Sequence, residues 1–147
     1  MHTKPRSAWT MVALLAATII AVASALPASA QSPASSASLQ SARSFLAITD
    51  RDDGKASWEV AGKQFRDAIT KEKWAEALHR VRAPLGTVAS RTVESTQFMD
   101  AFPGAARNGN YAILTFRTRF AAREAMETVT LEREADGLWV VIGYFIG

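Results

Sequence analysis

The chain has 147 residues, no cysteine and a formal net charge of +3, and 48% of its residues are hydrophobic. This length suits a single domain, and the composition is that of a globular protein rather than a disordered or collagen-like one. Without cysteine the chain can form no disulfide, no thiolate zinc site and no cysteine nucleophile.

The first 30 residues have the pattern of an export signal. Lys4 and Arg6 form a short basic start, an apolar run extends over residues 11–26, and residues 28–30 are Ala-Ser-Ala. This order is typical of a secretory signal peptide that is cleaved after a small residue. The apolar run is also shorter than the roughly 20 residues that span a bilayer. We therefore predict cleavage after Ala30 and export to the periplasm or the cell exterior, with no stable membrane anchor afterwards.

Cleavage at this position removes Lys4 and Arg6 and lowers the net charge from +3 to +1. A near-neutral domain lacks the sequence-independent attraction that carries nucleic-acid binding, so we expect no nucleic-acid partner. Residues 31–38, a mixture of Ser, Ala and Pro with one Gln, are predicted to form a disordered leader. The folded domain is then expected over residues 39–147.

Three helices are predicted in the first half of this domain. Apolar residues recur at helical spacing from Leu39 to Thr49 and again over residues 58–69. A third helix is predicted over residues 71–82, preceded by Thr70 as the capping residue. Gly62 weakens the middle of the second helix and can split it in two.

After Gly86 the apolar residues alternate, which indicates β-strands. The predicted strands cover residues 87–98, 111–120, 126–135 and 138–146. Asp136-Gly137 is typical of the hairpin turn between the last two strands. Helices followed by strands predict an α+β domain in which three N-terminal helices pack on a curved, four-stranded antiparallel sheet.

Five segments of the chain match a family pattern. They are ASWE at 56–59, TKEKW at 70–74, RAPLG at 82–86 followed by Ser90-Arg91, ETVTL at 127–131 and GYF at 143–145. Over roughly residues 39–147 the chain resembles a bacterial family of exported proteins known as domain of unknown function 4019. The resemblance implies a fold similar to the NTF2-like, cystatin-like α+β cone. It implies no activity, because that family has no established catalytic or binding residues.

Residues typical of catalysis are few. His79 is the one histidine after residue 30, and the neighbouring Arg80 opposes its protonation, so we expect an ordinary surface histidine. The sequence contains no Gly-x-Ser-x-Gly turn, phosphate loop or dinucleotide fingerprint. The acid–base pair of ketosteroid isomerases, enzymes of similar fold, has no matching motif here. We therefore assign no catalytic residue, metal ligand or cofactor.

Three arginines on predicted strands allow two interpretations. Arg117 and Arg119 share a polar strand face, and Arg91 lies on the preceding strand. The favoured interpretation is cross-strand ion pairing with Glu132 and Glu134. The alternative is a rim of guanidinium groups that binds an anionic ligand, because the planar fork of arginine fits carboxylate or phosphate.

The outer face of the predicted sheet is unusually apolar. The alternation of the last strand places Tyr144 opposite Trp139 and Phe145, on the same face as Ile142, and Tyr111 is expected there too. Such a patch is typical of a partner interface. We assign Tyr111, Ile142 and Tyr144 to an interface for a second copy or a protein partner.

These observations favour an exported, non-catalytic module that binds a ligand or a protein. Two alternatives remain open at this point. One is a small-molecule binder that uses the interior of the cone, and the other is an isomerase-like or dehydratase-like enzyme that uses the same interior.

Overall fold

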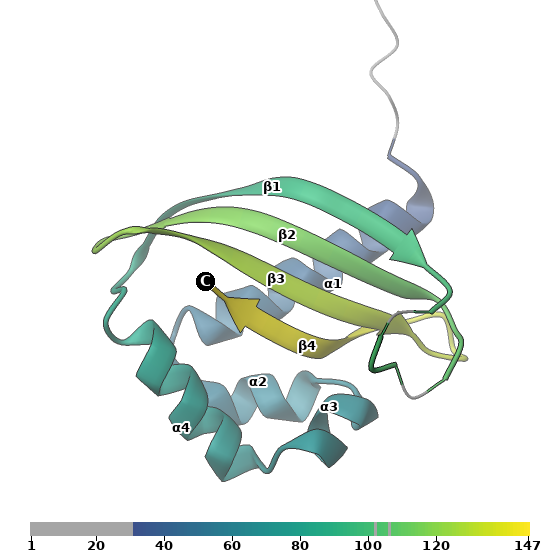
Figure 1. Ribbon diagram of the computed structural model, residues 1–147, viewed down its shortest axis with the longest axis horizontal. Coiled ribbons are helices and arrows are strands. Elements are labelled where there is room, and N and C mark those ends of the chain that lie inside the picture. Colours follow the sequence, from purple (N-terminus) through teal and green to yellow (C-terminus); the bar gives the residue numbers. More distant parts are fainter. Residues whose placement is uncertain (1–30, 102, 106) are drawn as a thin grey trace, which may run out of the picture. The chain divides into compact units, whose positions relative to one another are not determined.

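The computed structural model describes residues 31–101, 103–105 and 107–147 (Figure 1). The predicted signal peptide therefore lies outside the described residues. Within these described residues, four helices precede four strands: α1 (Pro33–Thr49), α2 (Gly54–Val60), α3 (Lys63–Ala68), α4 (Lys71–Arg82), β1 (Val88–Met99), β2 (Tyr111–Phe120), β3 (Glu124–Arg133) and β4 (Trp139–Ile146). Among the described helices, none combines the length and the apolar character needed to cross a membrane.

Helix α1 begins earlier than the sequence predicted. The side chain of Ser32 accepts a hydrogen bond from the N–H of Ser35 at 3.2 Å, and Pro33 lies in the first turn. Both features favour the start of a helix. Ser38 is fully buried, so this part of the helix packs on the domain. The prediction of a disordered leader over residues 31–38 is therefore wrong from residue 33 onward.

Gly62 separates α2 from α3. Its backbone is extended, and its N–H donates a hydrogen bond to the carbonyl of Val141 in β4 at 2.7 Å. A Cβ atom at this position would lie 2.7 Å from Cγ2 of Val140, so the close approach to β4 requires glycine. The domain consequently has four helices, because the second predicted helix is split at the weak point that the sequence indicated.

The four strands form one open antiparallel sheet in the order β1-β2-β3-β4. The sheet curves over α1, which packs mainly against β4 and also contacts β2 and β3 (Figure 1). Helix α3 contacts β4, and α2 and α4 pack against each other. The predicted α+β class and the four-stranded antiparallel sheet are confirmed.

Strand β2 shows the predicted alternation. Its even-numbered residues face the helices and are buried: Ala112, Leu114, Phe116, Thr118 and Phe120. The helices complete this core with aromatic rings, as in the edge-on contact of Phe65 and Trp74, whose ring centroids are 4.8 Å apart. Burial of such rings is a large part of the stabilisation of a domain of this size.

A bulge in β4 reverses the faces of its last residues. Leu131 of β3 pairs with Val141, but Thr130 pairs with Gly143, so Ile142 is an extra residue in β4. An extra residue shifts the alternation by one position. Tyr144 therefore turns toward the helices and Phe145 turns outward, with 68% of its surface exposed. The prediction of an outward Tyr144 and an inward Phe145 is wrong for this reason.

Candidate functional site

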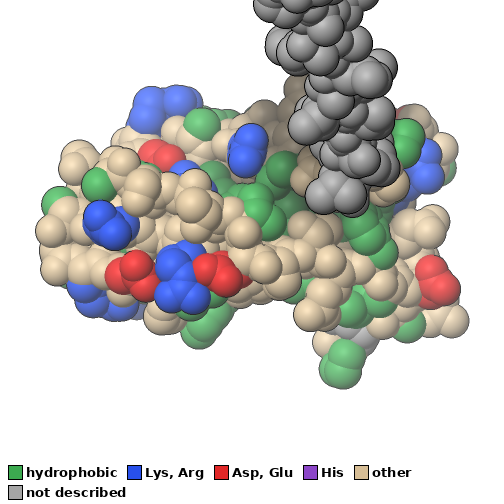
Figure 2. All heavy atoms as spheres, turned by 90° about the horizontal axis from the view of Figure 1, so that it is seen from above, with side chains coloured by type: hydrophobic (Ala, Val, Ile, Leu, Met, Phe, Trp, Pro, Cys, Tyr) green, Lys and Arg blue, Asp and Glu red, His purple; other side chains and the backbone are tan. Residues whose placement is uncertain are grey.

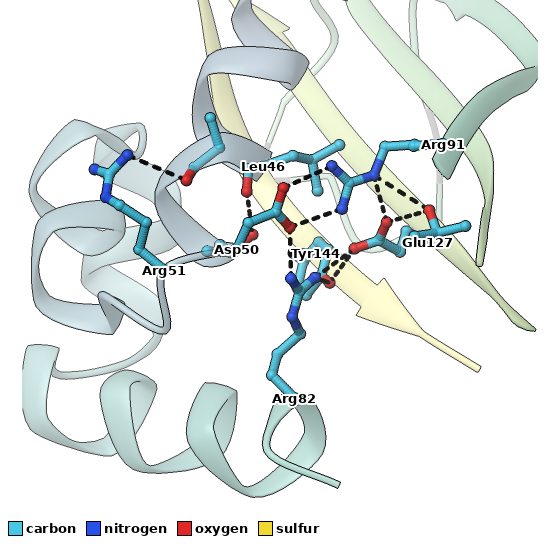
Figure 3. Close-up of polar contacts among 10 residues, drawn as sticks. Leu46, Asp50, Arg51, Arg82, Arg91, Glu127 and Tyr144 are labelled. Atoms are coloured by element: carbon cyan, nitrogen blue, oxygen red, sulfur yellow. Dashed lines mark hydrogen bonds and ion pairs between the residues drawn. The ribbon is translucent and has the colours of Figure 1, made fainter. Parts of the chain in front are cut away.

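Five residues from five different elements meet on the inner side of the sheet, and we call them the inner ion network (Figure 3). Asp50 follows α1, Arg82 ends α4, Arg91 lies on β1, Glu127 on β3 and Tyr144 on β4. The side chain of Glu127 is fully buried and that of Arg82 is 5% exposed. Direct contacts within the network join residues that are up to 62 positions apart in the sequence, as for Arg82 and Tyr144.

Arg91 binds two carboxylates at once. Its Nη1 and Nη2 donate to the two carboxylate oxygens of Asp50 at 2.9 and 2.8 Å, and its Nε donates to Oε2 of Glu127 at 2.7 Å. The two parallel bonds to Asp50 have the planar geometry that makes arginine a strong carboxylate partner. Arg91 is therefore not available as part of an anion-binding rim.

Arg82 and Tyr144 donate further hydrogen bonds to Glu127. Arg82 Nη1 donates to Oε1 of Glu127 at 2.8 Å, and the Tyr144 hydroxyl donates to the same oxygen at 2.7 Å. Thr118 also donates to Glu127, and Arg82 Nη2 donates to Asp50 at 2.5 Å. The two arginines and two carboxylates balance in charge, and among the described residues no buried side-chain polar atom lacks a hydrogen-bond partner.

The network shifts the pKa values of Asp50 and Tyr144 in opposite directions. Burial alone would raise the pKa of Asp50, but the hydrogen bonds from Arg91 and Arg82 outweigh burial and lower it. Burial and the charge of Glu127 raise the pKa of the Tyr144 hydroxyl above its usual value. A general acid or base works best with a pKa near the working pH. Both pKa values are shifted away from neutrality, as is typical of an ion network with a structural role.

The structure does not bring the three candidate arginines together. Arg91 faces inward, whereas Arg117 and Arg119 are exposed on the outer face. Arg117 pairs with Glu94 of β1 and with Glu124 of β3, the latter at 3.0 Å. The predicted cross-strand ion pairing is therefore confirmed for Arg117, but the predicted partners, Glu132 and Glu134, are wrong.

Charge on the surface is mixed rather than gathered by sign. On the face shown in Figure 2, the basic and acidic side chains lie interspersed. Glu132, predicted as a partner of the strand arginines, pairs instead with Arg107 at 2.5 Å. His79 is exposed, as expected, and pairs with Asp52. None of these pairs forms a site dominated by one charge.

The three predicted interface residues have different surroundings. Tyr111 is fully buried and its hydroxyl donates to the carbonyl of Arg107 at 2.7 Å, so its assignment to an exposed interface is wrong. Tyr144 belongs to the inner ion network, because the bulge turns it inward. Ile142 is half-buried at the bulge itself. Phe145 takes the exposed position that the alternation had assigned to Tyr144.

An open groove of about 430 Å³ lies between α1, the end of α2 and the start of β4, and we call it the α1–β4 groove. None of the described residues that line it is charged. The lining residues are Ala37, Gln40, Ser41, Ser44, Phe45, Ile48, Val60, Gly137, Leu138, Trp139, Val140 and Val141. Two of its apolar lining residues, Val60 and Leu138, are 54% and 63% exposed.

The sequence did not predict this groove. Residues 37, 41, 44 and 48 lie on one side of α1 at helical spacing, but they mix Ala, Ser and Ile and so resemble an ordinary helix flank. The fully apolar start of β4 was the available signal. Only the packing of α1 beside β4 shows that these two stretches face each other.

A smaller pocket of about 240 Å³ lies beside the inner ion network. Its charged lining residues already have partners: Asp50 pairs with Arg82, Asp52 pairs with His79, and Arg51 donates to the carbonyl of Ala47. The α1–β4 groove is therefore the better candidate for a ligand site.

Comparison with curated proteins gives no match to this chain. Comparison with protein-family models gives a match over residues 41–144 to DUF4019, described as a protein of unknown function. The matched range includes most of α1, the other three helices and nearly all of the sheet. The predicted family is thereby confirmed, and the chain belongs to the DUF4019 family.

Proposed function

We propose that this protein is an exported, non-catalytic binding module and that the α1–β4 groove is its ligand site. The observation that carries the proposal is the groove itself, which is open, uncharged and bordered by exposed apolar side chains. Its volume of about 430 Å³ lies in the range typical of ligand pockets. Exposed apolar surface of this kind favours binding of an apolar partner.

The absence of catalysis is inferred from the inner ion network. An enzyme that used the interior would need an acid or base with a pKa near neutrality. Asp50 has a lowered pKa and Tyr144 a raised one, and Glu127 is held by donors from Arg82, Arg91, Thr118 and Tyr144. This argument favours a binding module over the isomerase-like and dehydratase-like alternatives.

Export is inferred from the first 30 residues, which have the order of charge, apolar run and small residues of a signal peptide. We also infer that the fold is of the NTF2-like, cystatin-like kind. An antiparallel sheet curved over a long first helix supports this inference (Figure 1).

A second candidate is self-association through the outer face of the sheet. Its supporting observation is Phe145, which is 68% exposed close to the half-buried Ile142. Light scattering over a range of concentrations tests it. A dimer that Phe145→Lys dissociates is the expected result, and a monomer at every concentration removes this candidate.

The groove is tested with Nile red, an uncharged apolar dye that becomes fluorescent on apolar surfaces. Ala37→Trp fills the groove with a bulky side chain, whereas Ala47→Trp makes the same change at an exposed position of α1 outside it. We expect the dye to bind the mature protein, and Ala37→Trp to weaken binding by at least about tenfold, or about 1.4 kcal/mol. Ala47→Trp should bind like the unmodified protein. Equal binding by both variants contradicts the proposal.

A further inference from the structure

We propose that the α1–β4 groove binds an extended, uncharged peptide segment of a partner protein, which adds as a short strand to the open edge of β4. This inference rests on the proposed function and specifies the class of ligand. Addition of an extended peptide to an exposed sheet edge is a recurring mode of peptide recognition.

The groove exposes the backbone edge of β4. Five consecutive residues, 137–141, line it. Successive side chains of a strand point to opposite faces of the sheet. A groove on either face would therefore be lined by alternate residues. The lining includes three consecutive residues of β4, 139–141, together with the two residues before the strand, which indicates that the groove runs along the strand edge.

The hydrogen-bond pattern shows which backbone groups point into this edge. The carbonyl of Leu138 accepts from the N–H of Glu134 at 2.8 Å and so faces β3, whereas the carbonyl of Val141 accepts from Gly62 at 2.7 Å and so faces away from β3. In an antiparallel ladder these directions alternate with each residue. The N–H and C=O of Trp139 consequently face the open edge.

The protein's own chain already makes one contact of the proposed kind. Gly62 has an extended backbone and donates to Val141 as a neighbouring strand would. α3 then begins at Lys63, so the extended backbone ends directly after this contact. The edge beside Trp139 is left for another segment.

The opposite edge of the sheet is less suited to strand addition. β1 has register irregularities between Val88 and Ser90 and between Val93 and Ser95. Such bulges are a common way in which edge strands avoid pairing with other chains. β4 also has a bulge, at Ile142, but residues 139–141, which precede it and line the groove, pair with β3 in regular register.

The lining of the groove determines the chemistry of the peptide. Gln40, Ser41 and Ser44 supply uncharged polar groups from α1, and Phe45 and Ile48 supply apolar surface. A charged side chain placed here would lose hydration without gaining an opposite charge. The geometry therefore favours a segment of apolar and hydroxyl-bearing residues.

Amide hydrogen exchange of the mature protein provides the first test. In the free protein, the amide of Trp139 should exchange much faster than that of Val140, whose backbone faces β3. Slow exchange at Trp139 without added peptide would show that the edge is closed and would overturn the proposal.

The second test adds a blocked hexapeptide of alternating valine and threonine, and the same peptide N-methylated at every amide, which cannot donate a backbone hydrogen bond from either edge. Slower exchange at Trp139 with the first peptide, and at least tenfold weaker binding of the methylated one, is the expected result. Leu138→Lys and Val60→Lys, at the exposed rims of the groove, should weaken binding, while Val81→Lys on α4 should not.

The outcomes separate the two proposals. Equal binding of the unmodified and methylated peptides, or Nile red binding without peptide binding, overturns strand addition but leaves a binding groove for small apolar molecules. Failure of both the peptides and Nile red overturns the proposed function as well.

Discussion

Asp50 and Arg91 are joined by two parallel hydrogen bonds of 2.8 and 2.9 Å, although 41 residues separate them in the sequence. Asp50 directly follows α1 and Arg91 lies on β1, so this pair fixes the end of the first helix to an edge strand. Glu127 shares Arg91 with Asp50, which extends the connection to β3. The helical layer and the sheet are thus held together by charge as well as by the apolar core.

The first prediction concerns Arg91. Arg91→Met removes the cation that lies between Asp50 and the fully buried Glu127, so that both carboxylates must share the single charge of Arg82. Removing one partner of a buried ion pair typically costs about 3 kcal/mol or more. We expect the free energy of unfolding, measured in urea, to fall by that amount. Arg117→Met, on the exposed outer face, is the control and should leave the unfolding midpoint close to that of the unmodified protein.

The second prediction concerns acid. The pKa of Asp50 is lowered in the folded state, since the hydrogen bonds from Arg91 and Arg82 outweigh the effect of burial. Its contribution to stability is therefore complete above the unfolded-state pKa of about 4 and is lost as the pH falls through the lower folded pKa. The free energy of unfolding, measured from pH 6 to pH 2, should fall more steeply for the unmodified protein than for Asp50→Asn. Parallel curves would contradict this role of Asp50.

The third prediction compares two neighbours in β4. Tyr144 packs against the rings of both Phe45 and Trp74, at centroid distances of 6.0 and 6.1 Å, whereas Phe145 is 68% exposed. Tyr144→Ala should destabilise the domain by about 3 kcal/mol, as expected for loss of a packed aromatic ring. Phe145→Ala should change stability by no more than about 0.5 kcal/mol. Thermal unfolding measures both losses. A larger loss of stability for Phe145→Ala than for Tyr144→Ala would show that the bulge at Ile142 is absent.

This pair also shows how far the sequence could predict the fold. Helices and strands follow from local spacing, so β2 and α4 were predicted from their apolar residues. The faces of Tyr144 and Phe145 depend on one extra residue, Ile142, and the alternation of the strand carries no sign of it. The partners of Arg91 could not be predicted either. Asp50 and Glu127 are 41 and 36 residues away from it, and only tertiary packing brings them together.

The fourth prediction concerns Gly62. A Cβ there would lie 2.7 Å from Cγ2 of Val140 and 3.3 Å from the carbonyl oxygen of Val141. Gly62→Ala should therefore push α2 and α3 away from β4 and cost about 1–3 kcal/mol, the range for overpacked sites. Gly109→Ala is a matched control, because its Cβ would meet Tyr111 at an ordinary 3.5 Å. If both variants unfold at the same urea concentration, the close contact of Gly62 with β4 is not made.

The last prediction concerns processing. If residues 1–30 form a signal peptide, the exported protein begins at Gln31, one residue before Ser32, the capping residue of α1. Mass spectrometry of the protein recovered from the periplasm or the medium should give the mass of residues 31–147. Signal peptidases require small residues near the cut, so Ala28→Leu with Ala30→Leu should block cleavage and leave the full-length chain with the membrane fraction. Ser29→Leu changes the residue between them and should be processed normally. If the unmodified protein is found at full length in the soluble cytoplasmic fraction, export is contradicted.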